Sequence, residues 1–420
     1  MFNKITLDNG LRLITSAMPH TRSVSIVFFI GTGACYEAEA EAGISHFVEH
    51  LCFKGTKKRQ TTKEISEAIE SIGGIINGGT DKEVTTYWCR VTSQHFLLAL
   101  DVLVDLLLNS RFDAKDIDRE RHVIIEEINM SLDSPSQRVS MLIDELLWPE
   151  QPLGRDVAGS KETVAAINRQ QMLDFLPQHY LPNNTIVSIA GDIVQEQVQD
   201  VIKQSLGDWK PGKISDRFLS NSKQEAPRIR SEFRDSEQAH ICLGIPGLSL
   251  FHRDRYAVDL LSTVLGEGMS SRLFTEVREQ QGLAYDIQSY ADHFTESGSI
   301  IVHAGVAPKQ VGSALKSILE QLSQLKEGIS EMELNRAKEM AKGRLLLSLE
   351  NSRIVAAWLG AQEMLMNRIR TTDEVTCLVD AITREDLTRV AQQLITKEKL
   401  NLAIVGPVKE DKTLVELLRL

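Results

Sequence analysis

Residues 43–56 read GISHFVEHLCFKGT and contain the pattern His-x-x-Glu-His at His46, Glu49 and His50. We expect a helix here, and in a helix side chains three and four residues apart project from the same side. Two imidazoles one turn apart can chelate Zn²⁺, and a carboxylate between them can hold a water molecule beside the metal. The stretch therefore predicts a metal-binding helix, and the alternative is a surface helix that carries these three residues by chance.

A second helix, expected over 113–132, supplies the third protein ligand that a catalytic zinc site needs. Its predicted apolar stripe consists of Ile117, Val123, Ile124, Ile128 and Met130. The helical period places Glu120 and Glu127 within this stripe and Glu126 outside it. Buried carboxylates are costly unless they are paired or bound to a metal. We therefore expect Glu127 to be a metal ligand and Glu120 to bond to a ligating imidazole, the alternative being that both carboxylates pair with Lys or Arg.

The composition excludes several classes of protein. The chain has 420 residues, of which 42% are hydrophobic and 25% are charged, with a formal net charge of −11. This acidic balance argues against a general nucleic-acid binder. The longest purely apolar run in the first hundred residues, 26–30, is too short for a membrane span, and it has neither the position nor the basic flank of a signal peptide. Five scattered cysteines predict free thiols in a reducing, cytoplasmic compartment, with a processed organellar protein as the alternative.

The order of expected elements repeats along the chain. Strands are expected at 4–7, 11–14, 24–30, 84–91 and 185–190 in the first half and at 239–244, 285–290 and 298–305 in the second, with helices between them. Turn-forming residues crowd together over 210–230. We therefore expect an α+β fold of two homologous lobes, each a mainly antiparallel sheet covered by helices. The expected boundaries are 1–210, a linker over 211–230, and 231–420.

The segments 43–56 and 119–130 (RERHVIIEEINM) together resemble the pitrilysin and insulysin family of zinc peptidases, the inverzincins. The most similar branch is that of the mitochondrial processing peptidases and their short bacterial relatives. The interval between His50 and Glu127 matches the family's spacing between its second His and its Glu ligand. Segments 266–273 (GEGMSSRL) and 278–285 (REQQGLAY) resemble the family's second lobe, so that the likeness covers nearly the whole chain.

The resemblance implies a role for each matching residue. His46, His50 and Glu127 correspond to the zinc ligands, Glu49 to the general base, and Glu120 to the hydrogen-bond partner of a ligand. The implied mechanism is attack of a zinc-activated water on a peptide carbonyl, with Glu49 as proton acceptor.

The resemblance also implies substrate contacts. Arg278 and Tyr285 match an Arg and a Tyr that reach the substrate and the tetrahedral intermediate from the second lobe. The substrate-binding edge strand of the family corresponds to Asn77, Gly78, Gly79 and Thr80. Relatives usually carry Asn-Ala and then an aromatic residue there. We expect the two glycines to preserve main-chain binding of a peptide and to loosen the adjacent side-chain pocket.

These features predict a zinc-dependent endopeptidase that acts on peptides or unfolded polypeptides. Long relatives carry four lobes, whereas this chain has room for two. The resemblance therefore implies a dimeric chamber, formed with a second copy or with a related chain. Two alternatives remain: a non-catalytic scaffold or partner subunit of a processing-peptidase-like complex, and a metal hydrolase that acts on other bonds.

Overall fold

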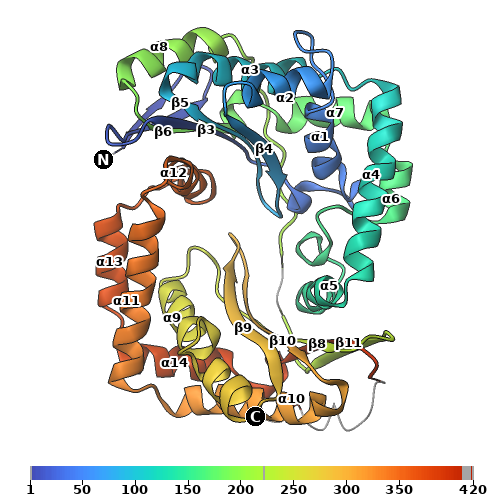
Figure 1. Cartoon of the computed structure of the whole chain (residues 1–420), viewed down its shortest axis with the longest axis vertical. Coiled ribbons are helices and arrows are strands. Elements are labelled where there is room, and N and C mark those ends of the chain that lie inside the picture. The colour runs from blue at the N-terminus through green and yellow to red at the C-terminus, as the bar shows by residue number, and fades with distance from the viewer. Residues whose placement is uncertain (1, 221–222, 409–417, 419–420) are drawn as a thin grey trace. The chain divides into compact units, whose positions relative to one another are not determined.

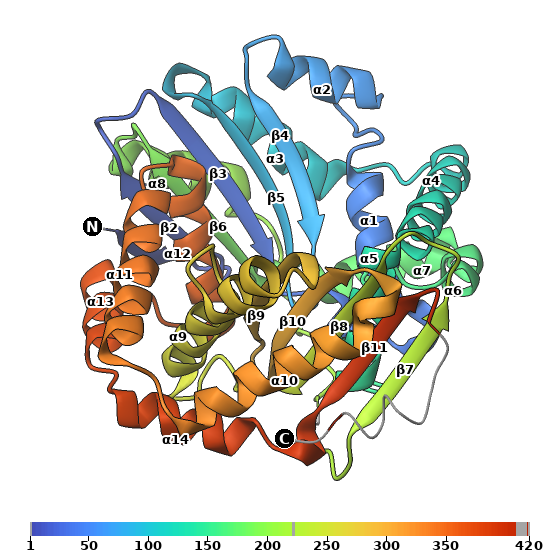
Figure 2. The same cartoon turned by 60° about the horizontal axis from the view of Figure 1, so that its bottom comes forward.

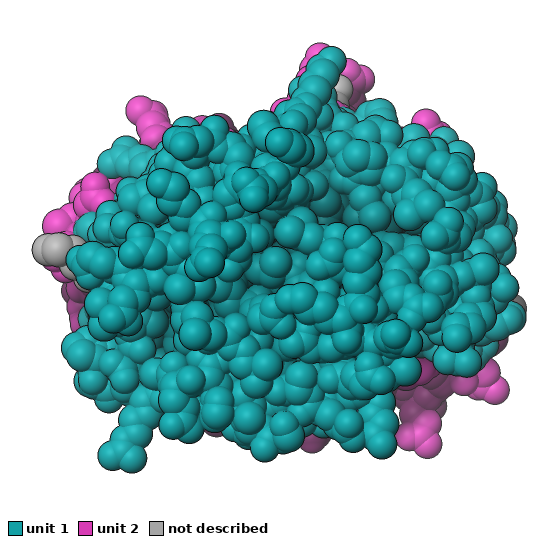
Figure 3. Space-filling view, turned by 90° about the horizontal axis from the view of Figure 1, so that it is seen from above, with its two compact units in different colours: residues 1–128, 156–218, 346–371 teal, residues 129–155, 219–345, 372–420 magenta. Residues whose placement is uncertain are grey.

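The structure is a computed structural model that describes residues 2–220, 223–408 and 418. It divides into two compact units, which Figure 3 colours separately. Unit 1 contains Met1–Ile128, Asp156–Phe218 and Leu346–Thr371, and unit 2 contains Asn129–Arg155, Leu219–Leu345 and Thr372–Leu420.

Unit 1 is built on a six-stranded sheet with the order β1-β2-β6-β3-β5-β4. Its strands are β1(Asn3–Thr6), β2(Arg12–Ala17), β3(Ser23–Ile30), β4(Ile75–Thr80), β5(Thr85–Thr92) and β6(Thr185–Gly191). All neighbours are antiparallel except β2 and β6. The strands expected at 4–7 and 11–14 correspond to β1 and β2, which form a hairpin: Thr6 lies opposite Arg12, and Gly10 turns the chain at a φ of 85°.

The helices of the first half include the two expected for the metal site, within 43–56 and over 113–132. The helices of this half are α1(Ile44–Cys52), α2(Thr62–Glu70), α3(Phe96–Asn109), α4(Ala114–Asp133), α5(Pro135–Leu147), α6(Lys161–Ala166), α7(Arg169–His179) and α8(Gln195–Leu206). Short 3₁₀ turns are η1(Ala34–Tyr36), η2(Glu39–Glu41), η3(Ser93–His95), η4(Pro152–Gly154) and η5(Pro182–Asn184).

Unit 2 is built on a five-stranded sheet with the order β7-β11-β8-β10-β9. The strands are β7(Arg228–Phe233), β8(Ala239–Pro246), β9(Ala284–His293), β10(Gly298–Val306) and β11(Asn401–Gly406). The helical elements of the second half of the chain, of which α12 belongs to unit 1, are α9(Arg255–Gly266), the π-helical η6(Phe274–Gln280), η7(Pro308–Gln310), α10(Val311–Glu327), α11(Glu331–Ser348), α12(Ser352–Met366), α13(Thr372–Asp380), α14(Arg384–Leu394) and η8(Lys397–Lys399).

The two sheets share one topology. In each, one early strand, β2 or β7, lies parallel to the last strand of the sheet in chain order, β6 or β11. The last strand is then followed by three antiparallel neighbours in the same order, β3-β5-β4 or β8-β10-β9. This repetition supports a duplicated α+β unit, and the predicted α+β fold with two helix-covered sheets is confirmed.

Each half of the chain contributes one helix to the sheet formed mainly by the other half. Helix α12, from the second half, packs on β3 and β6 of unit 1, where Figure 1 shows it against the sheet. Helix α5, from the first half, packs on β8 and β11 of unit 2. The predicted lobes, 1–210 and 231–420, describe the repeat along the chain and stay a prediction. The compact units combine segments from both lobes, because α12 belongs to unit 1 and α5 belongs to unit 2. Strand β7 also lies partly within the expected linker 211–230.

The described helices include none that is both long enough and apolar enough to cross a bilayer. All five cysteines are free thiols; four are buried, and the fifth, Cys377, is exposed.

Candidate metal centre

Helix α1 carries the His-x-x-Glu-His pattern and is fixed at its first turn by a buried carboxylate. The chain enters the helix through Gly43, whose φ of 95° suits glycine. The side chain of Glu37 accepts hydrogen bonds from the backbone N–H groups of Gly43 and Ser45, both at 2.8 Å. A carboxylate at this end also complements the helix dipole. Glu37 therefore sets where the helix begins, and with it the direction of the His side chains.

The two imidazoles converge on one point. His46 Nε2 and His50 Nε2 are 3.1 Å apart. Glu127, from α4, brings its Oε2 to 3.9 Å from the first nitrogen and 3.6 Å from the second. Glu49 also has a carboxylate oxygen within 4.8 Å of ligand atoms of both imidazoles. The structure thus brings together the four residues predicted for the metal and the base.

Glu49 faces the edge strand β4. A Cβ atom added at Gly78 would lie 2.5 Å from Glu49 Oε1 and 2.9 Å from Phe53 Cε2. Glycine at this position lets the strand approach the carboxylate closely. A Cβ added at Gly79, in contrast, would have only Thr86 Oγ1 within 4 Å, at 3.8 Å. The two adjacent glycines therefore differ: the first makes room for Glu49, and the second leaves open space beside the strand.

Glu120 bonds to His50, as predicted, and also to a lysine. Its Oε2 accepts a hydrogen bond from His50 Nδ1 at 3.3 Å, and its Oε1 lies 2.9 Å from Lys54 Nζ. Burial disfavours the charged carboxylate, but the bonds from His50 and Lys54 outweigh burial and lower the pKa of Glu120. Because Nδ1–H of His50 is directed at Glu120, the neutral ring presents a bare Nε2 to the site.

The environment separates the proton affinities of the two histidines. Burial, reinforced by the charge of His50, lowers the pKa of His46 to about 4. Burial acts in the same direction on His50, but its bond to Glu120 and the charges of Glu127 and Glu49 outweigh it and raise its pKa. Burial raises the pKa of Glu49. His46 is therefore a neutral nitrogen donor near pH 7 in the metal-free protein.

The apolar stripe predicted for α4 is only partly right. Glu120 is buried, but the side chain of Glu127 is 44% exposed. Val123 and Met130, expected within the stripe, are also exposed. The buried face is therefore narrower than a helical wheel suggests, since α4 packs through Ile117, Ile124 and Ile128. Glu127 stands at its border, close to both imidazoles yet open to solvent.

The other predicted site residues lie on two strands and a helical segment. Asn77, Gly78, Gly79 and Thr80 belong to β4, which is the last strand of the unit 1 sheet and lies beside α1 (Figure 2). Arg278, on η6, and Tyr285, on β9, belong to unit 2. The guanidinium carbon of Arg278 lies 5.5 Å from the centre of the Tyr285 ring, and Tyr285 is 75% exposed. The structure therefore brings these two residues together, with the phenol accessible.

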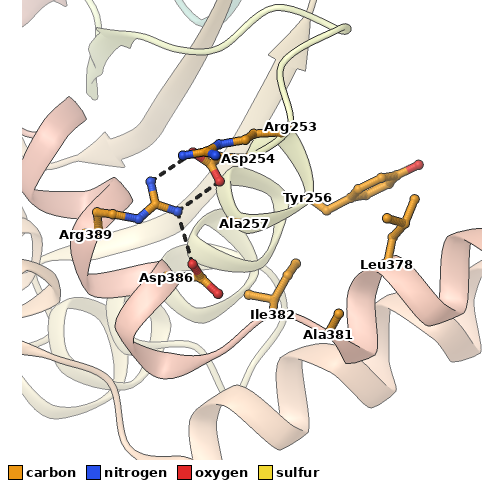
Figure 4. A pocket seen from close by; sticks show the side chains of 9 residues that line it. All are labelled: Arg253, Asp254, Tyr256, Ala257, Leu378, Ala381, Ile382, Asp386 and Arg389. Carbon is orange, nitrogen blue, oxygen red and sulfur yellow. Dashed lines mark hydrogen bonds and ion pairs between the residues drawn. The ribbon is translucent and has the colours of Figure 1, made fainter.

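A pocket in unit 2, apart from the metal centre, has its Arg389 paired with carboxylates within the protein. It measures about 360 Å³ and lies between α9, α13 and α14 (Figure 4). Its Arg389 donates two hydrogen bonds of 2.9 Å to Asp254 and one of 3.1 Å to Asp386. The charge of this arginine is thus neutralised within the protein, as Figure 4 shows.

Sequence reasoning missed two residues that hold the metal helix. Glu37 lies six positions before Gly43, outside the capping-box spacing, so local pattern carries no signal for it. Lys54 is the second such residue. It lies within the segment 43–56, and although a Lys or Arg partner was one alternative for Glu120, the sequence does not indicate which one.

Comparisons with known proteins are consistent with this site. Residues 12–161 match the model of the insulinase family, peptidase family M16, and residues 166–341 match a model described as the M16 inactive domain. A Bacillus subtilis protein named as an uncharacterized zinc protease, YmxG, is 36% identical over 412 residues, which cover 97% of this chain and 98% of the relative. A Streptomyces coelicolor protein, also named as an uncharacterized zinc protease, is 35% identical over 414 residues, which cover 97% of this chain and 90% of the relative.

Solved structures share the fold. A protease from Helicobacter pylori superposes with a TM-score of 0.92 at 23% identity, covering 97% of this chain and 99% of that one. A chain of Complex III₂ from Candida albicans gives a TM-score of 0.85 at 18% identity and covers both chains fully.

Proposed function

Because the chain belongs to the insulinase family of peptidases, family M16, we propose that it is a zinc-dependent endopeptidase that hydrolyses peptides or unstructured polypeptides. The observation that carries the proposal is the convergence of His46 Nε2, His50 Nε2 and Glu127 Oε2, with no two of these atoms more than 3.9 Å apart.

These donors fit a zinc ion. Tetrahedral coordination with Zn–N bonds of about 2.0–2.1 Å separates two ligand nitrogens by roughly 3.3 Å, close to the 3.1 Å between the imidazoles. His46, His50 and Glu127 would hold the ion, and the exposure of Glu127 leaves one side of the site open for water and substrate. A zinc ion bound there supplies a Lewis acid that acidifies water and polarises a carbonyl oxygen.

Glu49 acts as the base in this proposal. Its carboxylate lies among the ligands, where it can accept a proton from the attacking water and pass it to the leaving amine. Burial raises its pKa, and this favours its second task, because a carboxyl group of higher pKa holds the proton more firmly before delivery.

The free edge of β4 supplies a binding site for an extended peptide. An edge strand presents unpaired backbone N–H and C=O groups to which a peptide can add as a further strand. Residues Asn77, Gly78, Gly79 and Thr80 lie along this edge, and Gly78 is in contact distance of Glu49. A peptide added here would pass beside the base. For Tyr285 and Arg278 we propose the role that the resemblance implies, stabilisation of the oxyanion; the phenol of Tyr285 is accessible and lies beside Arg278.

We extend the proposal to a dimer, formed with a second copy or a related chain, that encloses the substrate in a cytoplasmic chamber. Its basis is the resemblance to four-lobed relatives and the free thiols of the cysteines. Light scattering of the active protein is the test, and a strictly monomeric active species would contradict the chamber.

The central experiment compares metal content with cleavage of an unstructured peptide library. We expect about one zinc per chain, cleavage that a chelator abolishes and zinc restores, and a Glu49→Gln variant that keeps zinc and loses cleavage. Glu127→Gln should lose zinc, whereas the matched control Glu126→Gln, which changes an exposed neighbour, should behave as wild type.

The rival function, a non-catalytic scaffold or partner subunit, stays open through the match of residues 166–341 to the M16 inactive domain and predicts no cleavage by any variant. Near-normal cleavage by zinc-loaded Glu49→Gln would refute the assigned base.

A further inference from the structure

The side chain of Lys54 ends at the carboxylate that supports a proposed zinc ligand. Each oxygen of Glu120 has its own partner: Oε1 lies 2.9 Å from Lys54 Nζ, and Oε2 lies 3.3 Å from His50 Nδ1. The three residues therefore form a chain from an ammonium group through a carboxylate to an imidazole, and this chain ends at the ring whose Nε2 faces His46.

The backbone holds Lys54 in this place. The helix α1 ends with hydrogen bonds from Phe53 N to the carbonyl of His50 and from Lys54 N to the carbonyl of Leu51, at 3.2 and 3.1 Å. Gly55 follows at a φ of 150°, and a Cβ there would lie 2.5 Å from the carbonyl oxygen of Gln60. The carbonyl of Gly55 accepts from Arg111 N at 3.1 Å. The ammonium group thus extends from a turn that is fixed on both sides.

The charge balance gives Lys54 a task beyond packing. Glu120 is 3% exposed, and a buried carboxylate needs a cation close by. An imidazole that binds a metal through Nε2 is neutral and donates one N–H, so it satisfies one oxygen without neutralising the charge. Lys54 supplies the positive charge and occupies the other oxygen, which leaves Oε2 directed at His50.

We propose that Lys54 is a positioning residue for the zinc site: it fixes Glu120 so that Glu120 orients His50 toward the metal. This inference deepens the proposed function, since it rests on the proposed zinc ligands, but it does not require peptidase activity. If Lys54 only tied α1 to α4, its loss would change stability without changing zinc affinity in the folded protein.

The test measures zinc affinity of the full-length chain by competition with a chromophoric chelator, together with the urea midpoint of the zinc-free protein. We expect Lys54→Met to weaken zinc binding by about tenfold, the lower end of the 10- to 100-fold loss that follows removal of a ligand's own hydrogen-bond partner, because Lys54 acts on His50 through Glu120. Lys54→Arg, which can still donate to Oε1, should restore most of the affinity. The matched control is Lys57→Met, at an exposed lysine three residues later, and should match wild type.

A double-mutant cycle decides whether Lys54 acts through Glu120. We expect Lys54→Met to have no further effect on zinc affinity in a Glu120→Gln background. Equal losses in both backgrounds, or affinity within twofold of wild type for folded Lys54→Met, would overturn the inference. Lys54→Gln serves in place of Lys54→Met where the methionine variant fails to fold.

The outcome is separable from that of the proposed function. If the wild-type protein binds zinc but cleaves no peptide, the peptidase function is refuted, while the role of Lys54 is still tested by the zinc affinities of its variants. Wild type that binds no zinc refutes both.

Discussion

The buried carboxylate of Glu37 offers a direct test of how the metal helix is held. Glu37 is 2% exposed and accepts two backbone N–H groups of the first turn of α1, from Gly43 and Ser45. The N-cap residue Gly43 has no side chain for this purpose. Replacing Glu37 by Ala removes both acceptor oxygens and leaves the buried N–H groups of Gly43 and Ser45 without these hydrogen bonds.

The expected cost follows from these two bonds. A hydrogen bond to a charged group contributes about 1.5–3 kcal/mol, and loss of a helix N-cap typically costs about 1 kcal/mol. We expect Glu37→Ala to lower the free energy of unfolding of unit 1 by about 3 kcal/mol. Glu37→Gln keeps one oxygen but turns an N–H₂ group toward the other donor, so its cost should be about half as large. Because His46 follows this turn directly, fraying should also weaken zinc binding by about tenfold in the alanine variant.

The assay is urea unfolding of the zinc-free protein followed by circular dichroism, with hydrogen exchange measured over residues 43–52. Glu39→Ala is the matched control, because it removes an exposed carboxylate two residues later. The reasoning would be refuted if Glu37→Ala and Glu39→Ala had the same urea midpoint and the same exchange rates in α1.

Two further predictions concern pH and substrate choice. Burial lowers the pKa of His179 to about 4. Between about pH 6.5 and 4 the unfolded chain therefore binds a proton at this residue that the folded chain does not bind. The free energy of unfolding consequently falls as the pH falls through this range. Unit 1 should lose on the order of 2 kcal/mol between pH 7 and 5 from this group; urea midpoints at both values should differ less in His179→Gln, and an equal difference would contradict the assignment. Gly79→Phe should leave zinc content unchanged, since a Cβ there meets only Thr86 Oγ1 at 3.8 Å, but should change the preferred substrate residue at one position of a peptide library. An unchanged cleavage profile would mean that the peptide does not lie beside Gly79.

The sequence predicts the metal centre well because its signal is local. A three- and four-residue spacing fixes which side chains share one side of a helix, so His46, Glu49 and His50 need no knowledge of the rest of the fold. The burial argument for α4 was less secure. It placed Glu120 and Glu127 on one buried face, but the helix is covered along a narrow line, and burial depends on neighbours that helical periodicity does not specify.

The exchange of α5 and α12 between the two halves of the chain could not be predicted from the sequence. Both helices are amphipathic, and an apolar face predicts that a helix packs on a sheet without saying which sheet. The particular contacts that decide it are long-range, such as the bonds of buried Glu363 on α12 with Lys4 at 2.6 Å and Arg12 at 3.2 Å. The same holds for the cap on α1, since nothing local links Glu37 to the helix six residues later.

Comparison of the two repeats shows what the polar contacts of the metal helix add. By topology α9 corresponds to α1, because each follows the strand that pairs antiparallel with the last strand of its sheet, β8 with β11 or β3 with β6. Helix α9 spans twelve residues, buries ten of them, and has no side-chain hydrogen bond at its N-cap. Helix α1 spans nine residues and buries seven of them, although it presents three polar side chains to the metal site. Charged groups lie at the ends of both helices. Asp254, at the N-cap of α9, accepts two hydrogen bonds of 2.9 Å from Arg389, and α1 has Glu37 at its first turn and the Glu120–Lys54 pair after its last. The difference lies in what the charged groups hold: in α1 one of them, Glu120, bonds directly to His50, so that its buried hydrogen bonds fix the geometry of the metal site as well as the helix.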